Sequence, residues 1–420
     1  MTDKVYCIRV LVSSLAQLVS KSLIDFIFTC NKIKQILVAS LELLATKRVI
    51  YKLIKNNNLK RYESNVFIFH KKTLLLINII KGWLMYIVSY IFLTLGGITL
   101  FLLGLKMMSE SMESFSGDGL KNLISNFTKN KYLGVLTGAF STAVLQSSVA
   151  TNVILIGFVS NNILSFYQAS AVIMGTNIGT TITAQIVSLS GGKSFDITAI
   201  AGLIAFIGFL LTFFSNKKVS GIGGVMVGFG TLFLGLKIVN EGVVFFKNFQ
   251  EFCNIFLINN EILLLFNGIL ITSIVQSSSA VTSIMILLAS NGLLAFENSM
   301  FLILGANIGT CFVVIFASLN KSVEAQRTAF FNLAFNLFGT LVLIIPLIIF
   351  KSEVSLIFSS FSNGVEREIA NFHTLFNVVV TLIILPILRP FTKVVDNFVK
   401  HEKPIKNNKK QVLVASKEYN

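Results

Sequence analysis

The sequence predicts an all-helical, polytopic membrane protein. Of its 420 residues, 54% are hydrophobic and only 13% are charged, with a mean hydropathy of +0.78, whereas soluble domains carry about 25% charged residues. Asp, Glu, Lys and Arg are absent from 132 to 192 and again from 262 to 294. Uncharged apolar runs of about 18 residues or more are long enough to cross a bilayer.

Three short motifs occur twice along the chain. TLFLLGLKMM at Thr99 is echoed by TLFLGLKIV at Thr231. QSSVAT at Gln146 is echoed by QSSSAV at Gln276, and GTNIGTT, whose Asn is Asn177, by GANIGTC, whose Asn is Asn307. The last two motifs recur at the same spacing, which indicates two halves of one ancestral unit. Many secondary transporters are built from such internal repeats.

Each Gln-Ser tract lies midway along an apolar segment, 133–160 in one half and 263–290 in the other. The tract leaves arms of about a dozen residues, or roughly 18 Å of helix, which is short of the roughly 30 Å hydrocarbon core. We therefore expect two re-entrant helical hairpins with the tracts at their tips. A single long, tilted helix is the alternative.

Full spans are expected near 86–106, 165–187, 197–215, 220–238, 298–319, 328–350 and 368–388. Three spans and one hairpin in each half make an odd count, so the second half should be inverted relative to the first. The expected organisation is a basic extension at 1–84, transport repeat 1 at 85–216, transport repeat 2 at 217–350, a final transmembrane helix at 351–390, and a basic cytoplasmic tail at 391–420.

The charged residues of the loops predict the orientation. With the amino end of the first span outside, the positive-inside rule places inside Lys121, Lys129, Lys131, Lys217, Lys218, Lys321, Arg327 and the tail from Arg389, and outside Glu241, Glu251, Glu261, Glu353, Glu366 and Glu368.

Residues 1–84 hold 14 Lys and Arg against 4 Asp and Glu, and they contain no clean span. This extension is either a loosely folded arm or the product of an upstream start codon, with Met85 as the first residue. In the expected orientation it falls outside, which favours Met85. The net charge of +16 fits cytoplasmic loops facing anionic lipid better than nucleic acid. The four scattered cysteines indicate neither a disulfide framework nor a metal site.

The two tracts could bind ions or merely hold helices together. Hydroxyl, amide and backbone oxygens suit Na⁺, and N–H groups at the start of a half-helix suit an anion. An oxyanion beside Na⁺ would form a neutral cluster. Ser and Thr also hydrogen-bond between packed helices in membranes, but two matched tracts, each followed by Gly-x-Asn-Ile-Gly-Thr, favour binding. His373, near the start of the last span, is expected to bond a neighbouring helix rather than to relay protons.

QSSVATN, GTNIGTT, QSSSAVT, GANIGTC and IANFHTLFN (369–377) resemble the bacterial branch of the type II sodium–phosphate cotransporter family, over about 85–390. The resemblance implies Na⁺-coupled transport of inorganic phosphate by alternating access in the cytoplasmic membrane. The sequence departs from the family pattern at three points. Val149 stands where a third hydroxyl is usual, and the extension 1–84 has no counterpart. Only a short tail follows Pro390, where many relatives have a PhoU-like domain.

The expected phosphate- and sodium-binding residues are those of the tracts and of the Gly-x-Asn-Ile-Gly-Thr elements: Gln146, Ser147, Ser148, Thr151, Asn177, Thr180, Gln276, Ser277, Ser278, Ser279, Thr282, Asn307 and Thr310. Individual sodium ligands are left open. Sodium is expected as a co-substrate and no cofactor is expected.

An enzyme is disfavoured by the sequence. No histidine lies in either repeat core to pair with a serine, and the HExxH motif of metalloproteases is absent. A carrier or channel for another small oxyanion, or a membrane regulator that does not transport, stays open as an alternative.

Overall fold

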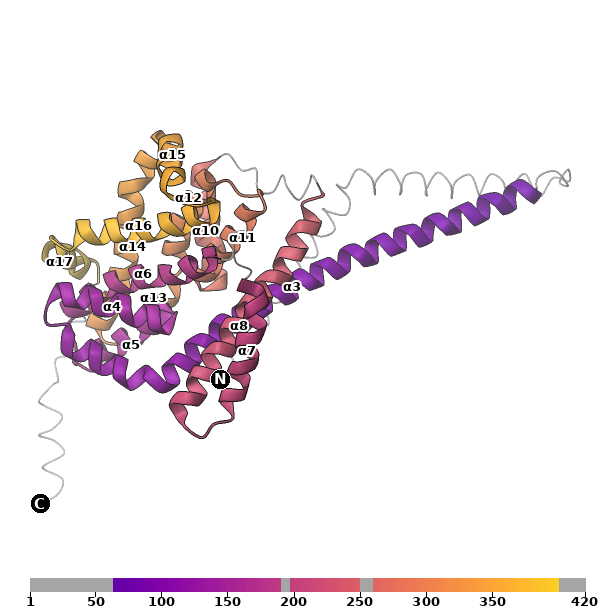
Figure 1. Ribbon diagram of the computed structural model, residues 1–420. Coiled ribbons are helices and arrows are strands. Elements are labelled where there is room, and N and C mark those ends of the chain that lie inside the picture. The colour runs from indigo at the N-terminus through magenta and orange to yellow at the C-terminus, as the bar shows by residue number, and fades with distance from the viewer. Residues whose placement is uncertain (1–62, 190–196, 250–259, 400–420) are drawn as a thin grey trace, which may run out of the picture. The chain divides into compact units, whose positions relative to one another are not determined.

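The computed structural model describes residues 63–189, 197–249 and 260–399, and every regular element in these ranges is helical (Figure 1). The α-helices are α3 (Glu63–Phe127), α4 (Lys131–Leu145), α5 (Ser148–Ser160), α6 (Phe166–Ser188), α7 (Ile197–Thr212), α8 (Lys217–Phe246), α10 (Glu261–Val275), α11 (Ser278–Ser290), α12 (Phe296–Gly309), α13 (Cys311–Ser318), α14 (Val323–Ile349), α15 (Lys351–Phe361), α16 (Val365–Ile384) and α17 (Leu388–Phe398).

The chain divides into two compact units, residues 1–95 with 244–257 and residues 96–243 with 258–420. In the described part of the first unit, the Tyr90 ring stacks on Phe245 with centroids 3.9 Å apart, and Tyr86 packs edge-on against the same ring. All the candidate site residues lie in the second unit.

Four helical stretches in the described ranges are long and apolar enough to cross a membrane: Leu84–Ser114, Lys217–Phe246, Phe296–Ser318 and Val323–Ile349. A fifth crossing is formed if α16 and α17, which meet at a bend of 92°, count as one span. The protein is therefore a multi-pass, all-helical membrane protein.

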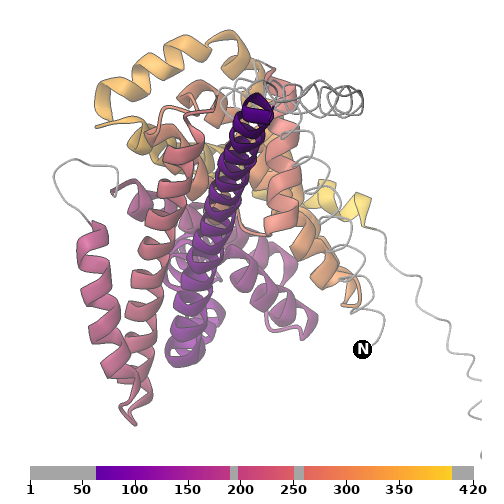
Figure 2. The ribbon, with the colours of Figure 1, turned by 90° about the vertical axis from the view of Figure 1, so that its right-hand side faces the viewer.

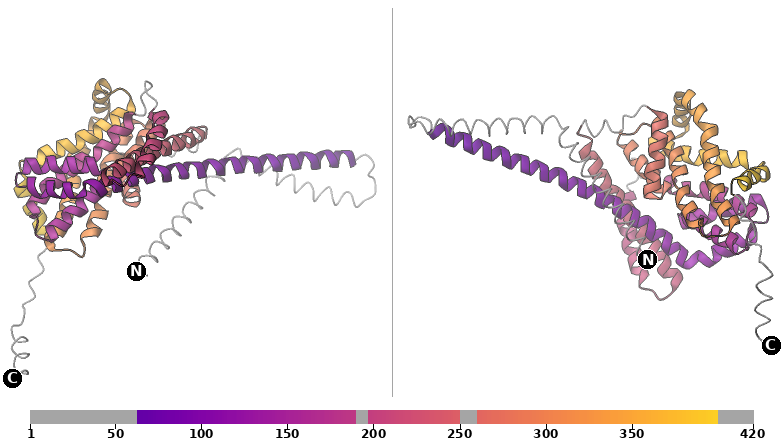
Figure 3. Two further views of the ribbon diagram at one scale, coloured as in Figure 1. Left: turned by 60° about the horizontal axis from the view of Figure 1, so that its bottom comes forward. Right: turned by 180° about the vertical axis from the view of Figure 1, so that it is seen from behind.

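The helix boundaries differ from the expected ones at several points. Helix α3 begins at Glu63 and runs without a break to Phe127, so the expected boundary at 84–85 falls inside a helix (Figure 3). The last expected span, 368–388, ends at Ile384, where the chain turns into α17. The expected boundary at 390–391 therefore also lies within a helix. Residues 1–62 and 400–420 lie outside the described ranges.

Both Gln-Ser tracts interrupt a helix, as expected. Gln146 (φ 55°, ψ 21°) and Gln276 (φ 62°, ψ 20°) adopt left-handed conformations, and the serines that follow them are extended. In the first tract the Thr142 hydroxyl donates to Thr151 Oγ1 over 3.1 Å, whereas nine residues of straight helix would span about 13.5 Å. The chain therefore doubles back, and the nearly identical angles give the second tract the same reversal. These contacts exclude the single tilted helix.

Glycines bring each hairpin into close contact with the helix that follows it. A Cβ at Gly138 would lie 2.0 Å from the Val172 carbonyl oxygen, and one at Gly175 would lie 1.9 Å from the Val135 oxygen. The second half repeats this at the equivalent positions, with Gly268 against Leu302 and Gly305 against Leu265. Any larger side chain would push these backbones apart.

The first echoed motif serves helix packing as well. A Cβ at Gly104 of α3 would lie 2.4 Å from the Leu232 nitrogen, and one at the equivalent Gly235 of α8 would lie 2.3 Å from the Phe101 nitrogen. Helix α8 also packs on α7, because Gly230 lies against the carbonyl oxygen of Ala201 (Figure 2). The two copies of the motif thus pack against each other, and each contributes its equivalent glycine, Gly104 or Gly235.

The net charge differs between the two ends of the helices α4–α6 and α10–α17, although Glu324 and Asp396 lie at the basic end and Lys351 and Arg367 at the acidic end. The basic end, where α4, α6 and α14 begin and α16 finishes, carries Lys131, Lys321, Arg327, Arg389 and Lys393. The acidic end, where α10, α12 and α16 begin, carries Glu261, Glu297, Glu353, Glu366 and Glu368. Hairpin α4/α5 opens at the basic end and hairpin α10/α11 at the acidic end.

Replacing Gly175 or Gly305 by Ala should destabilise the protein, because each Cβ would overlap a backbone oxygen that cannot move without shifting a helix. Overpacking of this kind costs about 1–3 kcal/mol, measurable as a lower thermal unfolding temperature of the purified protein. Gly157 on α5, which has no atom within 4 Å of a built Cβ, is the matched control, and Gly157→Ala should be neutral or stabilising. Equal effects at all three positions would contradict close packing.

Candidate functional site

The two hairpin tips contact the same turn of α6. The hydroxyl of Thr183 donates to Gln146 Oε1 of the first tip over 2.7 Å. The hydroxyl of Ser279 in the second tip donates to the Thr180 carbonyl oxygen over 3.2 Å. Thr180 and Thr183 are separated by a rise of only about 4.5 Å along the helix, so the two tracts, far apart in sequence, lie next to each other. Helix α6 itself is buried along most of its length.

Part of the tract chemistry is used to build the tips. Ser147 and Ser277 cap α5 and α11 by accepting hydrogen bonds from the backbone N–H groups of Ala150 and Ala280. Such caps satisfy donors that a helix start leaves unpaired. The hydroxyl of Ser279 donates to a carbonyl oxygen of α6. Ser147, Ser277 and Ser279 therefore already have hydrogen-bond partners within the protein.

Other tract groups have no such commitment. The hydroxyls of Ser148 and Ser278, at the first positions of α5 and α11, have no hydrogen-bond partner among the described residues, and neither does the amide of Gln276. The first backbone N–H groups of both helices also lack intrahelical acceptors. These are the groups of the tips that can receive a ligand.

Where equivalent positions of the two halves carry different residues, the second half lacks hydrogen bonds that the first half makes. Thr142 bonds Thr151 in the first half, but the counterpart of Thr151 is Val281, and the Thr272 hydroxyl is buried with no partner in the described ranges. Asn152 Oδ1 accepts from Thr176, whereas its counterpart Thr282 is unpaired among the same residues because position 306 is alanine. The second hairpin therefore has fewer polar contacts, both between its own arms and to the helix that follows it.

The asparagines of the Gly-x-Asn-Ile-Gly-Thr elements contact two later helices. Asn177 Nδ2 donates to Asn332 Oδ1 over 3.1 Å, and Asn336 Nδ2 donates to Asn177 Oδ1 over 3.3 Å. Asn307 Oδ1 lies 3.1 Å from His373 Nε2, which gives His373 the expected bond to a neighbouring helix. The hydroxyls of Thr180 and Thr310 bond carbonyls of their own helices.

Sequence reasoning missed Asn332, Asn336 and Asn377 as members of this cluster. The signal was a further internal repeat: FNLAFNLFGT from Phe331 in α14 and FHTLFNVVVT from Phe372 in α16 share both phenylalanines, the second asparagine and the final threonine. Helix α14 hydrogen-bonds Asn177 through Asn332, and α16 hydrogen-bonds Asn307 through His373. Helix α16, expected to be an additional span, is thus the counterpart of α14.

Several buried polar atoms in this cluster have no partner among the described residues. They are Thr282 Oγ1, Asn307 Nδ2, Asn336 Oδ1, His373 Nδ1 and Asn377 Oδ1. Buried polar groups in folded proteins are nearly always hydrogen-bonded to protein, water or ligand. This cluster therefore has capacity for a polar ligand or water. In the described ranges no group of three or more His, Cys, Asp or Glu could hold a metal. The unpaired oxygens of the cluster belong to a hydroxyl and two amides and are therefore neutral.

The family described as Na⁺/Pi-cotransporter matches residues 100–241 and 245–362, which include both tracts and both Gly-x-Asn-Ile-Gly-Thr elements. The chain belongs to this family.

Relatives are found in bacteria and in animals. An "Uncharacterized protein YqeW" of Bacillus subtilis (strain 168) is 28% identical over 71% of this chain and 94% of its own length. The "Putative inorganic phosphate export protein YjbB" of Escherichia coli (strain K12) is 26% identical over 73% of this chain and 55% of its own length. The human "Sodium-dependent phosphate transport protein 2B" is 33% identical over 24% of this chain and 15% of its own length. The chain thus spans about half the length of the export protein, and no solved structure matches it.

Val149→Ser should stabilise the protein rather than change ligand binding. The equivalent Ser279 donates to Thr180 O, and Thr310 is the counterpart of Thr180 in the second half, so a serine at 149 would meet the Thr310 carbonyl across the contact between α5 and α13. A net hydrogen bond is worth about 1 kcal/mol, readable in thermal unfolding. Val149→Ala, which shortens the side chain without adding a hydroxyl, is the control. Indistinguishable unfolding of the two variants would show that no such bond forms.

Proposed function

We propose that the protein is a sodium-coupled symporter of inorganic phosphate that works by alternating access. The observation that carries this proposal is the meeting of the two hairpin tips on one turn of α6, through Thr183–Gln146 and Ser279–Thr180. A binding site between two quasi-equivalent halves can open to either side when one half moves against the other.

The tips supply groups for both ions. Helices α5 and α11 start at the tips with free N–H groups and the hydroxyls of Ser148 and Ser278, an arrangement that favours an oxyanion. Helices α4 and α10 finish there, and their last carbonyl oxygens suit Na⁺. Because no carboxylate, ammonium or guanidinium side chain occurs from 132 to 192 or from 262 to 294, each ion would provide most of the counter-charge of the other.

The proposed ligand set is the one expected from the sequence, with distinct parts. Ser148, Gln276 and Ser278 would contact the ions directly, with Gln146 beside them. Ser147, Ser277, Ser279 and Thr151 would shape the tips, while Asn177, Thr180, Thr282, Asn307 and Thr310 would line the floor between α6, α12, α14 and α16. The individual sodium ligands stay unassigned.

We further propose that the two halves form inverted repeats in the cytoplasmic membrane of a bacterium. Repeat 1 would include α3 to α6, repeat 2 would include α8 to α13, and α14 and α16 would be a further equivalent pair, with the basic tail in the cytoplasm. Support comes from the hairpins opening at opposite ends, one basic and one acidic. The positive-inside rule places the basic end in the cytoplasm.

Direction needs no separate mechanism. Coupling between Na⁺ and phosphate at one site is reciprocal, so the imposed gradients decide whether phosphate enters or leaves. A relative named for phosphate export is therefore compatible with a symporter. A carrier of another oxyanion would show the same coupling with a different substrate, a channel would conduct without a Na⁺ gradient, and a regulator would do neither.

Labelled phosphate uptake into proteoliposomes, with an inward Na⁺ gradient or with K⁺ in its place, tests the function. Uptake above equilibrium only with Na⁺ is expected. Ser278→Ala should weaken apparent phosphate affinity roughly 10- to 150-fold, because a hydrogen bond to a charged group is worth about 1.5–3 kcal/mol. The control is Ser290→Ala, at the far end of α11 with its hydroxyl bonded to Leu287 O, which should transport normally. Unchanged transport in Ser278→Ala and Gln276→Ala would show that the hairpin tips are not the ion-binding site.

Single cysteines at Asn162, beyond the open end of the first hairpin, and at Glu297, beyond that of the second, should react with impermeant thiol reagents from opposite sides of oriented membrane vesicles. The expectation follows from the basic and acidic ends of the two hairpins. Labelling of both cysteines from the same side would refute the inverted arrangement without touching the assignment of the substrate.

A further inference from the structure

Helix α17 has two different faces and lies across the end of α16. It follows the 92° bend, and Leu388, Thr392 and Val395, at helical spacing, are buried against the body. Outside this buried stripe Val394 is 53% exposed and Phe398 is 79% exposed. A short helix with charged residues on one face and exposed apolar residues beside them is typical of the membrane–water interface.

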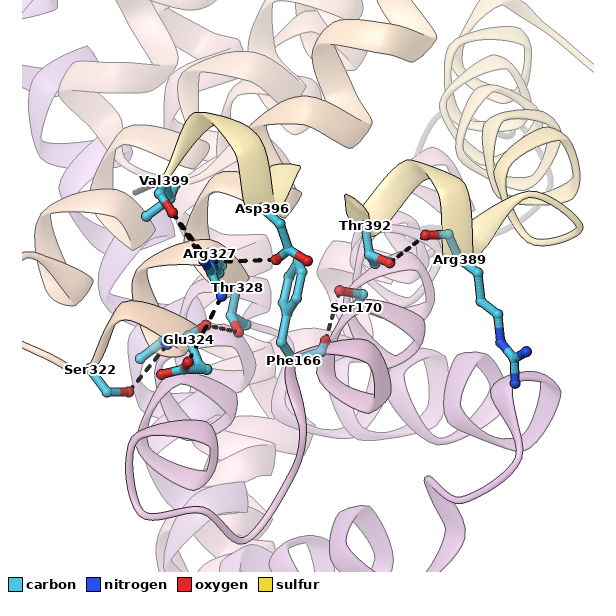
Figure 4. A network of polar contacts seen from close by, with 11 residues as sticks. Phe166, Ser170, Ser322, Glu324, Arg327, Thr328, Arg389, Thr392, Asp396 and Val399 are labelled. Carbon is cyan, nitrogen blue, oxygen red and sulfur yellow. Dashed lines mark hydrogen bonds and ion pairs between the residues drawn. The ribbon is translucent and has the colours of Figure 1, made fainter. Parts of the chain in front are cut away.

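The inner face of α17 is fixed to α14. The buried guanidinium of Arg327 lies 3.4 Å from Asp396 Oδ1, and its Nε and Nη2 both donate to the Val399 carbonyl oxygen over 3.3 Å (Figure 4). The ring of Phe391 packs edge-on against Phe331 and Phe338 of α14. These contacts keep Val394 and Phe398 directed outward, so the exposed face is a constant feature of this end of the molecule.

The outward face also carries positive charge. Arg389 extends from α17 away from Arg327 (Figure 4), with its guanidinium 5.9 Å from the centre of the Tyr167 ring. Lys393 is exposed on the next turn. In the part of the chain that the structure describes, neither cation has a carboxylate within 4 Å.

A second cation and aromatic pair lies beside the end of α16. Lys131 Nζ donates to the Leu385 carbonyl oxygen over 2.9 Å, and it lies 5.3 Å from the centre of the Tyr132 ring, a residue that is 59% exposed. Tyrosines and lysines are common where protein meets the lipid headgroups. The surface thus combines cations, amphipathic rings and apolar side chains at one end of the helices.

We propose that Lys131, Tyr132, Arg389, Lys393, Val394 and Phe398 form a docking surface for anionic phospholipid headgroups. The charge of the cations is complementary to phosphatidylglycerol and similar lipids, and Phe398 with Val394 enters the acyl boundary beside them. The positive-inside rule assigns this basic end to the cytoplasmic leaflet. This inference requires only that the protein is embedded in a membrane, so it stands or falls independently of phosphate transport.

The test measures lipid retention by the full-length protein in nanodiscs that contain phosphatidylcholine and phosphatidylglycerol. The double variant Arg389→Gln/Lys393→Gln should retain phosphatidylglycerol roughly 30-fold less tightly, which corresponds to about 1 kcal/mol for each cation near a charged membrane surface. Lys217→Gln/Lys218→Gln removes two exposed cations at the start of α8 and should leave this retention intact. An equal loss of phosphatidylglycerol retention in both double variants would show that only the net charge of the protein matters, and it would overturn the proposal.

A fluorophore attached at Asn397→Cys, in a background with the four native cysteines replaced by alanine, reports the same surface directly. Its emission should shift to the blue in vesicles with phosphatidylglycerol and much less in pure phosphatidylcholine. Phe398→Ser should reduce the shift in both lipids, because apolar insertion is lost. Emission that is already shifted in detergent and insensitive to lipid would mean that a second copy or another protein covers the face, and would refute lipid docking.

Discussion

The structure depends on one constraint, which is that two helices are broken deep within an apolar segment. A helix break exposes backbone N–H and C=O groups, and the hydrocarbon region of a membrane offers no water to receive them. At each break the left-handed glutamine returns its N–H to a threonine carbonyl, and the following serine caps the next helix. At the second break Ser278 and Ser279 are buried against α6, whereas Gln276 is exposed and Gln146 to Ala150 are partly exposed. The unpaired groups that make the breaks costly therefore remain accessible at the tips.

The departures from symmetry bear on how the two halves could move. The repeats match closely in their motifs but differ at the positions that fasten each hairpin: Val149 against Ser279, Thr151 against Val281, and Asn332 against His373. The first hairpin is closed by Thr142–Thr151 and bonded to α6 of its own half by Asn152–Thr176, while the second contacts the first half through Ser279. The two hairpins are therefore quasi-equivalent in backbone but unequal in their polar contacts.

Much of the fold could be predicted from the sequence because apolar length and close repetition are local signals. The helix breaks at Gln146 and Gln276 followed from arms too short to span. What could not be predicted depends on tertiary contacts. The continuation of α3 upstream to Glu63 had no periodic pattern to reveal it, and the turn at Ile384 is stabilised by Lys131, which is distant along the chain. The amide cluster of α14 and α16 was readable in principle, but its shorter spacing was masked by the stronger repeat of the two halves.

Helix α14 contacts both α17 and the centre of the protein. Its first turns hold α17 through Arg327 and Phe331, and the residue after Phe331 is Asn332, which contacts Asn177 in the centre of the protein. Helix α14 therefore both anchors α17 and bonds the amide cluster beside the tips. Arg327 is suited to this task because its planar fork binds a carboxylate and a backbone carbonyl at once. Because the Asp396 side chain is 39% exposed, this ion pair contributes little net stability, and its role is to fix the geometry between α14 and α17.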